Sequence, residues 1–441
     1  MERMISQTNF FETESVWKIL VRIAPPVMLA QLIQALYNIV DSYFVGHFSG
    51  DGLTALSVMF PIQLVITAFS IGIGTGVNIL IARLYAQKHY ILADHVAGAG
   101  SVLAFLAWVI FSIAAYLLLP GYVRTSASSP DAVSYAITYG NIVCIGSLGI
   151  FLESTWTKIH QAGGNMRLPM IAQITGALIN IILDLLLIFG LGPFPRMGIA
   201  GAAIATIIGQ FAAAAITGQK VIHRPPRPVI MLPYFARILK MGSSYILMQV
   251  MCTVYIMVLN VILAGFSDGA VTVLGLYYKF QSFFFIPLLA LMTCIVPVLS
   301  YNFACKNYTR CKQVLLDSSM ISLMFMAIGF FCFECLPTQL ISLFSTDSDV
   351  LAIGVPAFRI IGISFFSAVF SLITPIFFQA IGELMPSLLL SLTRPVFCLM
   401  PIFWLLSLRG LSYTWLAFPA AETITGILGV IMCMHQMQKW K

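Results

Sequence analysis

Four acidic side chains stand inside long apolar stretches, where carboxylates are rare. Asp41, Glu153, Asp184 and Glu422 each lie well within a stretch that is long and apolar enough to cross a membrane. An ionisable group in such a stretch is costly to bury, and it usually has a function or a charged partner. These four positions are therefore the first candidates for ion binding, proton transfer or recognition of a charged molecule.

The composition explains why so few acids stand out. Of the 441 residues, 60% are hydrophobic and only 9% are charged, whereas soluble domains carry about 25% charged residues. This excludes an ordinary soluble enzyme, a secreted module and a disordered chain, and it predicts an all-α polytopic membrane protein. Windows of about 20 apolar residues predict twelve spans, at 19–45, 54–82, 92–119, 135–158, 168–190, 197–219, 236–264, 271–301, 313–336, 351–378, 387–408 and 412–435.

The distribution of lysine and arginine predicts the orientation of these spans. With the N-terminus inside, the inside segments carry 17 of the basic residues and the outside loops carry 3. Positive charge accumulates on the cytoplasmic side of membrane proteins. We therefore expect both termini in the cytoplasm of a bacterium and the spans in its plasma membrane. Basic residues scattered over membrane loops do not form a nucleic-acid patch, so no nucleic-acid partner is expected.

The chain matches itself when it is shifted by 218 residues. Tyr37 then meets Tyr255, Ser49 meets Ser267, Lys88 meets Lys306, and Gln161-Ala162 meets Gln379-Ala380 in the same register. The repeat predicts two pseudo-symmetric six-helix lobes, at 1–218 and 236–441, joined by a basic, proline-rich cytoplasmic linker at 219–235. Because six is even, both lobes enter the membrane in the same direction, which is a transporter architecture.

Two of the four acids lie at a similar depth in the first lobe. Asp41 is about five residues from the outer end of its span, and Asp184 is about six from the outer end of its own. Asn180 precedes Asp184 by one helical turn and shares its face, and Thr206 lies at a compatible depth. The second lobe has Leu259 in place of Asp41, and Ile402 beside Pro401 in place of Asp184. The two carboxylates are therefore not required merely to build a six-helix lobe.

This arrangement leaves two interpretations open. Each aspartate is a hydrogen-bonded packing residue, or the pair forms a cation site. Two carboxylates close together in a medium of low dielectric constant resist simultaneous ionisation, so the pair can hold a proton or bind Na⁺ through oxygen ligands. Glu153 either meets a cationic substrate or pairs with Lys158 or a nearby backbone group. Arg394 and Glu422 are expected to form a structural ion pair in the second lobe.

Several segments resemble one family, the MATE (multidrug and toxic compound extrusion) transporters. The resemblance lies in the run from Gln34-Ala35-Leu36-Tyr37-Asn38 to Asp41 and Gly46, in Gly72-Ile73-Gly74-Thr75-Gly76, in Gln161–Pro169, in Asn180-Ile181-Ile182-Leu183-Asp184, and in Gly198–Thr206. It covers nearly the whole chain. It implies two six-helix lobes that alternate between inward-open and outward-open states, and export of amphipathic, often cationic, drugs against a proton or Na⁺ gradient.

The resemblance also implies roles for individual residues. In the DinF-like branch, the coupling site is in the N-terminal lobe, and its residues match Asp41, Asn180, Asp184 and Thr206. The NorM-like branch instead uses acids on helices 7 and 10, where this chain has none within the spans. Glu153 resembles a residue of MepA-like exporters. No cofactor is expected beyond the coupling ion, H⁺ or Na⁺; that Na⁺ would sit at Asp41, Asn180 and Asp184. The transporter is expected to act as a monomer.

Aromatic and polar residues could complete a cleft for such substrates. Gln34, Tyr37, Tyr255, Phe283 and Phe284 are the candidates, because aromatic rings can bind cations or stack on them, although ordinary packing explains each ring as well. One alternative function is a flippase for a lipid-linked oligosaccharide, which Arg359 and Arg394 would favour. A membrane-embedded enzyme is a more remote alternative, since the sequence has no H-E-x-x-H or phosphate-loop motif.

Overall fold

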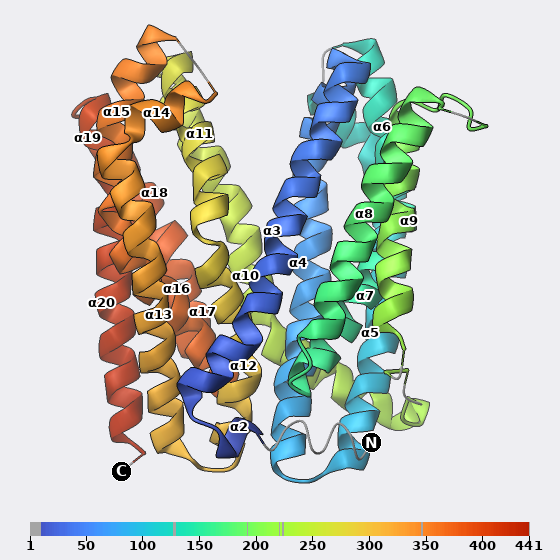
Figure 1. Cartoon of the computed structure of the whole chain (residues 1–441), viewed down its shortest axis with the longest axis vertical. Helices are drawn as coiled ribbons and strands as arrows, with labels where there is room; N and C mark the ends of the chain where they lie inside the picture. The colour runs from blue at the N-terminus through green and yellow to red at the C-terminus, as the bar shows by residue number, and fades with distance from the viewer. Residues whose placement is uncertain are drawn as a thin grey trace. The chain divides into compact units, whose positions relative to one another are not determined.

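The computed structural model describes residues 10–126, 129–191, 193–219, 221–222, 225–344 and 347–440. All regular structure in these residues is helical, as predicted (Figure 1). Within this part of the chain, eleven helices are long and apolar enough to cross a membrane, and the pair Pro130–Gly146 and Leu148–Ala162, bent by 43°, can form a twelfth span. Each of the twelve predicted spans overlaps one of these segments, so the polytopic all-α fold class is confirmed.

The described residues form two compact units. Unit 1 contains residues 26–246 and unit 2 contains residues 10–25 and 247 onward. Two helices are shared between the units, since the division falls after Pro25 in α3 (Val16–Phe48) and after Ile246 in α10 (Pro228–Ala264). These boundaries differ from the predicted lobes 1–218 and 236–441, because residues 10–25 are part of unit 2 and residues 236–246 are part of unit 1. The predicted linker at 219–235 lies partly outside the described residues.

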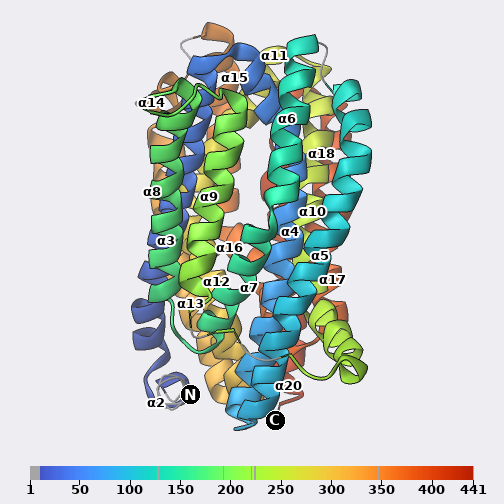
Figure 2. The same cartoon turned by 90° about the vertical axis from the view of Figure 1, so that its right-hand side faces the viewer.

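Unit 1 consists of long helices with short connections (Figures 1 and 2). Besides its parts of α3 and α10, it contains α4 (Gly50–Ala86), α5 (Tyr90–Ser126), α6 (Pro130–Gly146), α7 (Leu148–Ala162), α8 (Arg167–Phe189) and α9 (Ile199–Thr217). α8 and α9 pack closely through glycine. A Cβ atom on Gly176 would lie 2.7 Å from the Gly209 carbonyl oxygen, and one on Gly209 would lie 2.6 Å from that of Gly176. Small residues permit this approach of two membrane helices.

Unit 2 contains more interrupted helices. They are α2 (Phe10–Thr13), α11 (Asp268–Phe284), α12 (Ile286–Ala304), α13 (Tyr308–Cys335), α14 (Pro337–Ser342), α15 (Ser348–Gly362), α16 (Ser364–Ile381), α17 (Leu384–Leu392), the π-helix η1 (Thr393–Leu399), α18 (Met400–Ser407), α19 (Leu411–Thr414) and α20 (Ala417–Gln438). The N-terminal segment is held by side chains of this unit. Arg310 donates to the carbonyl oxygens of Phe11 (2.9 Å) and Glu14 (2.6 Å), and Asn302 also donates to that of Phe11 (3.2 Å).

The 218-residue repeat is visible in the backbone. Lys88 and Lys306 have φ angles of 59° and 58°, and they are the positive-φ residues other than glycine in the described chain. Gly164 and Gly382, also 218 apart, have φ angles of 80° and 83°. These left-handed residues follow helix ends, where such a residue lets the last carbonyls find partners. The two lobes therefore share their helix-ending geometry as well as part of their sequence.

Two predicted spans are broken at related places. The segment predicted at 135–158 breaks between α6 and α7 at Ser147, and the segment predicted at 351–378 breaks between α15 and α16 at Ile363. At each break a serine hydroxyl donates to the carbonyl oxygen three residues earlier, Ser147 to Cys144 (2.7 Å) and Ser364 to Ile361 (2.6 Å). Such bonds compete with the backbone bonds of the helix. Hydropathy does not report this local competition, so the breaks were not predicted.

The repeated helix ends generate a stability prediction. Replacing Gly164 or Gly382 by alanine should destabilise the protein by about 1–2 kcal/mol, because a Cβ atom is unfavourable in the left-handed conformation. Replacing Lys88 or Lys306 by glycine should stabilise it by a smaller amount. Thermal melting of the four purified variants in detergent checks this. The assigned backbone conformation would be contradicted if the alanine variants melted no lower than the unchanged protein, or if the glycine variants melted no higher than it.

Candidate functional site

A cavity of about 80 Å³ lies in unit 1 between α3, α7, α8 and α9. Its lining includes Gln34 and Tyr37 from α3, Glu153 from α7, Asn180 from α8 and Thr206 from α9. All five were predicted site residues, and they come from four helices spread over about 170 positions of the chain. The cavity has room for several water molecules. It is thus a small polar chamber inside a helical bundle, with one carboxyl group in its wall.

The carboxyl groups of Asp41 and Asp184 meet beside this chamber. They lie within hydrogen-bonding reach of each other. Asp184 is fully buried, and among the described residues no N–H or hydroxyl group donates to either of its oxygens. Two ionised carboxylates cannot donate a hydrogen bond to each other. The contact therefore becomes favourable only when a proton or a metal cation lies between the two groups.

Asn180 and Thr206 add further oxygen atoms next to this pair. The Asn180 Nδ2 atom donates to the Thr206 hydroxyl at 3.4 Å, and that hydroxyl donates to the Ala202 carbonyl oxygen at 3.0 Å. The Asn180 Oδ1 atom is buried and has no hydrogen-bond partner among the described residues. Asn180 and Asp184 lie one turn apart on α8, as expected. Their uncompensated oxygens are the ligand type that hard cations prefer.

Glu153 lines the chamber, whereas Asp41 and Asp184 are not among its lining residues. Thr157 donates to Glu153 Oε1 at 2.8 Å, and Gln173 also contacts the carboxyl group. Lys158 also acts on it electrostatically. The hydrogen-bonding partners of the carboxyl group, Thr157 and Gln173, are both neutral. These neutral groups donate hydrogen bonds to the Glu153 carboxyl group without supplying a counter-charge.

Some residues of the chamber were not singled out from the sequence. Gln173 and Gln210 bring two further amides to its wall, and the Gln210 Oε1 atom has no partner among the described residues. Tyr139, fully buried on α6, receives a hydrogen bond from Gln63 at 3.0 Å and contacts Thr206. Glutamine inside an apolar span was the available signal. Glycines 176 and 209 also line the cavity, and nothing in the sequence distinguishes them from other helical glycines.

The predicted cleft aromatics separate into two groups. On α3, Gln34 Nε2 donates to the Tyr37 hydroxyl at 2.9 Å, and both residues line the chamber. Tyr255, Phe283 and Phe284 belong to unit 2. Tyr255 packs on Tyr278 with ring centroids 6.3 Å apart, and Phe284 packs edge-on against Phe333 at 5.8 Å. Phe283 is half-buried. The chamber lining thus includes Tyr37 and none of these three rings.

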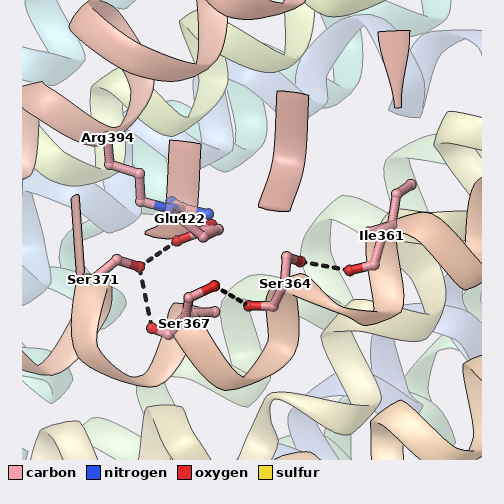
Figure 3. A network of polar contacts seen from close by, with 7 residues as sticks. Ile361, Ser364, Ser367, Ser371, Arg394 and Glu422 are labelled. Atoms are coloured by element: carbon pink, nitrogen blue, oxygen red, sulfur yellow. Dashed lines mark hydrogen bonds and ion pairs between the residues drawn. The ribbon is translucent and has the colours of Figure 1, made fainter. Parts of the chain in front are cut away.

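Unit 2 has its own buried charged cluster (Figure 3). The Arg394 Nε atom donates to Glu422 Oε1 at 2.7 Å, and Ser371 donates to the other carboxyl oxygen. The predicted ion pair between Arg394 and Glu422 is therefore confirmed. Arg359, the other arginine that was considered for an anionic substrate, is exposed and donates to the Glu334 carbonyl oxygen at 3.3 Å. Neither arginine provides an unpaired buried positive charge.

Comparison with known proteins gives the family. The sequence profile of the family described as MatE matches residues 26–186 and again residues 245–405. A protein named FAD transporter from Shewanella oneidensis is 25% identical over 430 residues, covering 96% of this chain and 94% of its own length. The multidrug export protein MepA of Staphylococcus haemolyticus is 24% identical over 444 residues, covering 97% of this chain and 95% of its own length.

Solved structures share the fold. An outward-facing multidrug resistance MATE transporter of the MOP superfamily superposes with a TM-score of 0.90 at 22% identity, over 98% of both chains. A MOP superfamily transporter from Pyrococcus furiosus superposes with a TM-score of 0.89 at 22% identity, also over 98% of both chains. The double match of one profile agrees with the internal repeat. This multi-pass membrane chain, with its buried carboxyl pair in one of two repeated units, belongs to the MatE family.

Proposed function

We propose that the protein is a secondary active exporter that exchanges H⁺ or Na⁺ for amphipathic, often cationic, small molecules by alternating access. One observation carries the coupling part of this proposal. Asp184 is fully buried, contacts Asp41, and has oxygens that no described donor satisfies. Such a carboxyl pair is unstable without a proton or cation. Its occupancy therefore follows the ion concentration, which is what coupling to an ion gradient requires.

Ion binding at this pair would act on the helices that carry it. Asp41 lies on α3, Asp184 and Asn180 lie on α8, and Thr206 lies on α9. Loading the pair removes the repulsion between α3 and α8, so the packing of α3 against its neighbours changes with occupancy. The chamber next to the pair is lined by the same helices. Substrate affinity and ion occupancy are therefore expected to be coupled through α3 and α8, and each affects the other equally.

The energy available from the ion is sufficient for export. Moving one elementary charge through 100 mV corresponds to about 2.3 kcal/mol. A free energy of about 1.4 kcal/mol changes an equilibrium tenfold, so one coupled charge supports a substrate gradient of about 50-fold. One or two ions per cycle at the Asp41–Asp184 pair therefore supply useful work without ATP.

The chemistry of the chamber favours a cationic substrate. Relatives named multidrug export protein MepA support export of drug-like compounds, and Glu153 offers them a buried negative charge beside the Tyr37 ring. The relative named FAD transporter raises a nucleotide as a second candidate substrate. A diphosphate would be repelled by Glu153 and by the aspartate pair. The same repulsion, together with the neutralised Arg394, argues against a lipid-linked diphosphate and thus against a flippase.

The remaining assignments follow from this proposal. We expect a multi-pass protein of a bacterial plasma membrane, with both termini in the cytoplasm as the distribution of lysine and arginine indicates. A monomer is sufficient, because the proposed ion-binding site at Asp41 and Asp184 and the chamber both lie within one chain. Neither a cofactor nor catalysis is part of the proposed cycle; the partners are the substrate, the coupling ion and the lipid bilayer.

Removing either carboxylate should uncouple transport. In proteoliposomes, Asp41→Asn and Asp184→Asn should each lower gradient-driven efflux of a cationic dye by at least about tenfold, because an amide cannot exchange a proton or neutralise Na⁺. Efflux is measured under a pH gradient and under a Na⁺ gradient imposed separately, which also identifies the coupling ion.

The matched control for these variants is Asp131→Asn, which changes an exposed aspartate at the start of α6. It should transport like the unchanged protein. Full efflux in both buried-aspartate variants would remove the proposed coupling site, and efflux driven by neither gradient would remove antiport itself.

Glu153 should determine the preference for positively charged substrates. Glu153→Gln keeps a hydrogen-bonding side chain of nearly the same shape and removes the charge. We expect the KM for a monocationic substrate to rise about tenfold, equivalent to about 1.4 kcal/mol, and the KM for a neutral substrate to change little. Glu334→Gln, which alters an exposed acid on α13, is the control. An equal rise for charged and neutral substrates would mean that Glu153 only maintains the shape of the chamber.

A further inference from the structure

The two units contain cavities at repeat-related positions, and these cavities differ in volume. A second cavity, of about 10 Å³, lies in unit 2. Five of its lining residues stand 218 positions after lining residues of the unit 1 chamber. The matched pairs are Gln34 with Cys252, Glu153 with Ser371, Gln173 with Ser391, Gly176 with Arg394, and Ala177 with Pro395. The internal repeat therefore duplicated the chamber along with the helices around it.

All five matched pairs differ in residue type, and the pair that differs most in side-chain volume is Gly176 and Arg394. Unit 1 has Gly176, which has no side chain, and a cavity of about 80 Å³. Unit 2 has Arg394 at the matching position, and a cavity of about 10 Å³, which holds one water molecule at most. Arg394 is only 8% exposed. Its side chain thus takes up space that remains open in the other copy.

Residues next to the Arg394 guanidinium are the repeat partners of residues that line the chamber of unit 1. The Arg394 Cζ atom lies 5.7 Å from the centre of the Tyr255 ring, and Tyr255 is the repeat partner of Tyr37, which lines the chamber of unit 1. The thiol of Cys252, partner of Gln34, also contacts Arg394. The duplicated cavity therefore places a cation against the face of an aromatic ring, the arrangement expected for cation–π attraction.

The negative charge also has a counterpart in each copy, although it comes from a different helix. In unit 2 the carboxyl group belongs to Glu422 of α20 and is held by Ser371 of α16. In unit 1 the position of Ser371 is taken by Glu153 itself, and Ile204 stands where Glu422 would be. Each copy of the cavity thus has one carboxyl group near the repeat position that Glu153 and Ser371 share. Only the one in unit 2 has a guanidinium beside it.

We propose that Arg394 is a built-in occupant of a duplicated cation site, and that the site accepts a free guanidinium ion once the arginine side chain is removed. In the intact protein, the arginine closes this copy, so that exchangeable cations bind in unit 1 only. The η1 π-helix, Thr393–Leu399, carries the arginine. π-helical turns often occur where a helix presents a functional side chain. This inference concerns binding in unit 2, and it does not depend on antiport.

The test is chemical replacement of the missing side chain. Arg394→Ala should melt at a lower temperature than the unchanged protein, because Glu422 is left as a buried charge without its partner. Methylguanidinium chloride should restore part of this loss in a saturable manner, with a half-maximal concentration on the order of 1 mM. Methylurea, its neutral analogue, and NaCl at equal ionic strength should not. Arg409→Ala, which removes an exposed arginine, should show no specific response.

A double variant keeps the test valid if Arg394→Ala does not fold. Arg394→Ala combined with Glu422→Gln opens the cavity without leaving a lone charge, and it should respond to methylurea rather than to methylguanidinium. The proposal would be overturned if methylguanidinium stabilised the unchanged protein as much as Arg394→Ala, or if methylurea stabilised Arg394→Ala as much as methylguanidinium does. It would also be overturned if neither compound raised the melting temperature of the double variant. Because melting is measured without a gradient, these results are independent of whether the protein transports.

Discussion

The polar interior of this protein depends on the cost of a carboxylate that is removed from water. A buried charge is tolerated only when a counter-charge or a set of hydrogen bonds compensates it. The protein meets this requirement in two ways. In unit 2, Glu422 is compensated permanently by Arg394 and Ser371. In unit 1, Asp184 contacts another carboxyl group, and in the proposed cycle its compensation comes from a proton or Na⁺ that can leave again.

The two units of one repeated architecture therefore differ in how their buried carboxyl groups are compensated. A permanent ion pair between η1 and α20 joins those helices whatever the ion concentration outside. In the proposed cycle, the aspartates on α3 and α8 instead respond to that concentration. In that cycle, ion binding changes unit 1, and unit 2 keeps its ion pair. The asymmetry in charge thus arises on a backbone whose repeat is preserved even at the left-handed residues Lys88 and Lys306.

Much of the fold could be predicted from the sequence, because membrane spans are a direct consequence of apolar length. The twelve segments and the 218-residue repeat needed no tertiary information. The depth of Asp41 and Asp184 followed from counting residues, and the position of Asn180 followed from helical periodicity. The breaks at Ser147 and Ile363 could not be predicted in this way, since they depend on serine hydroxyls that compete for backbone carbonyls. The packing of residues 10–25 with unit 2 depends on Arg310 and Asn302, almost 300 positions away.

The site shows the same limit at the level of side chains. Tyr37 and Tyr255 are equivalent in the sequence repeat, and both were reasonable candidates for a cleft. Their surroundings differ because position 176 is glycine and position 394 is arginine. The first ring faces an open chamber, and the second is covered by a guanidinium. An aromatic residue in a membrane helix therefore indicates a cation-binding surface only when the space over its face is known, and that space is determined by a residue on another helix.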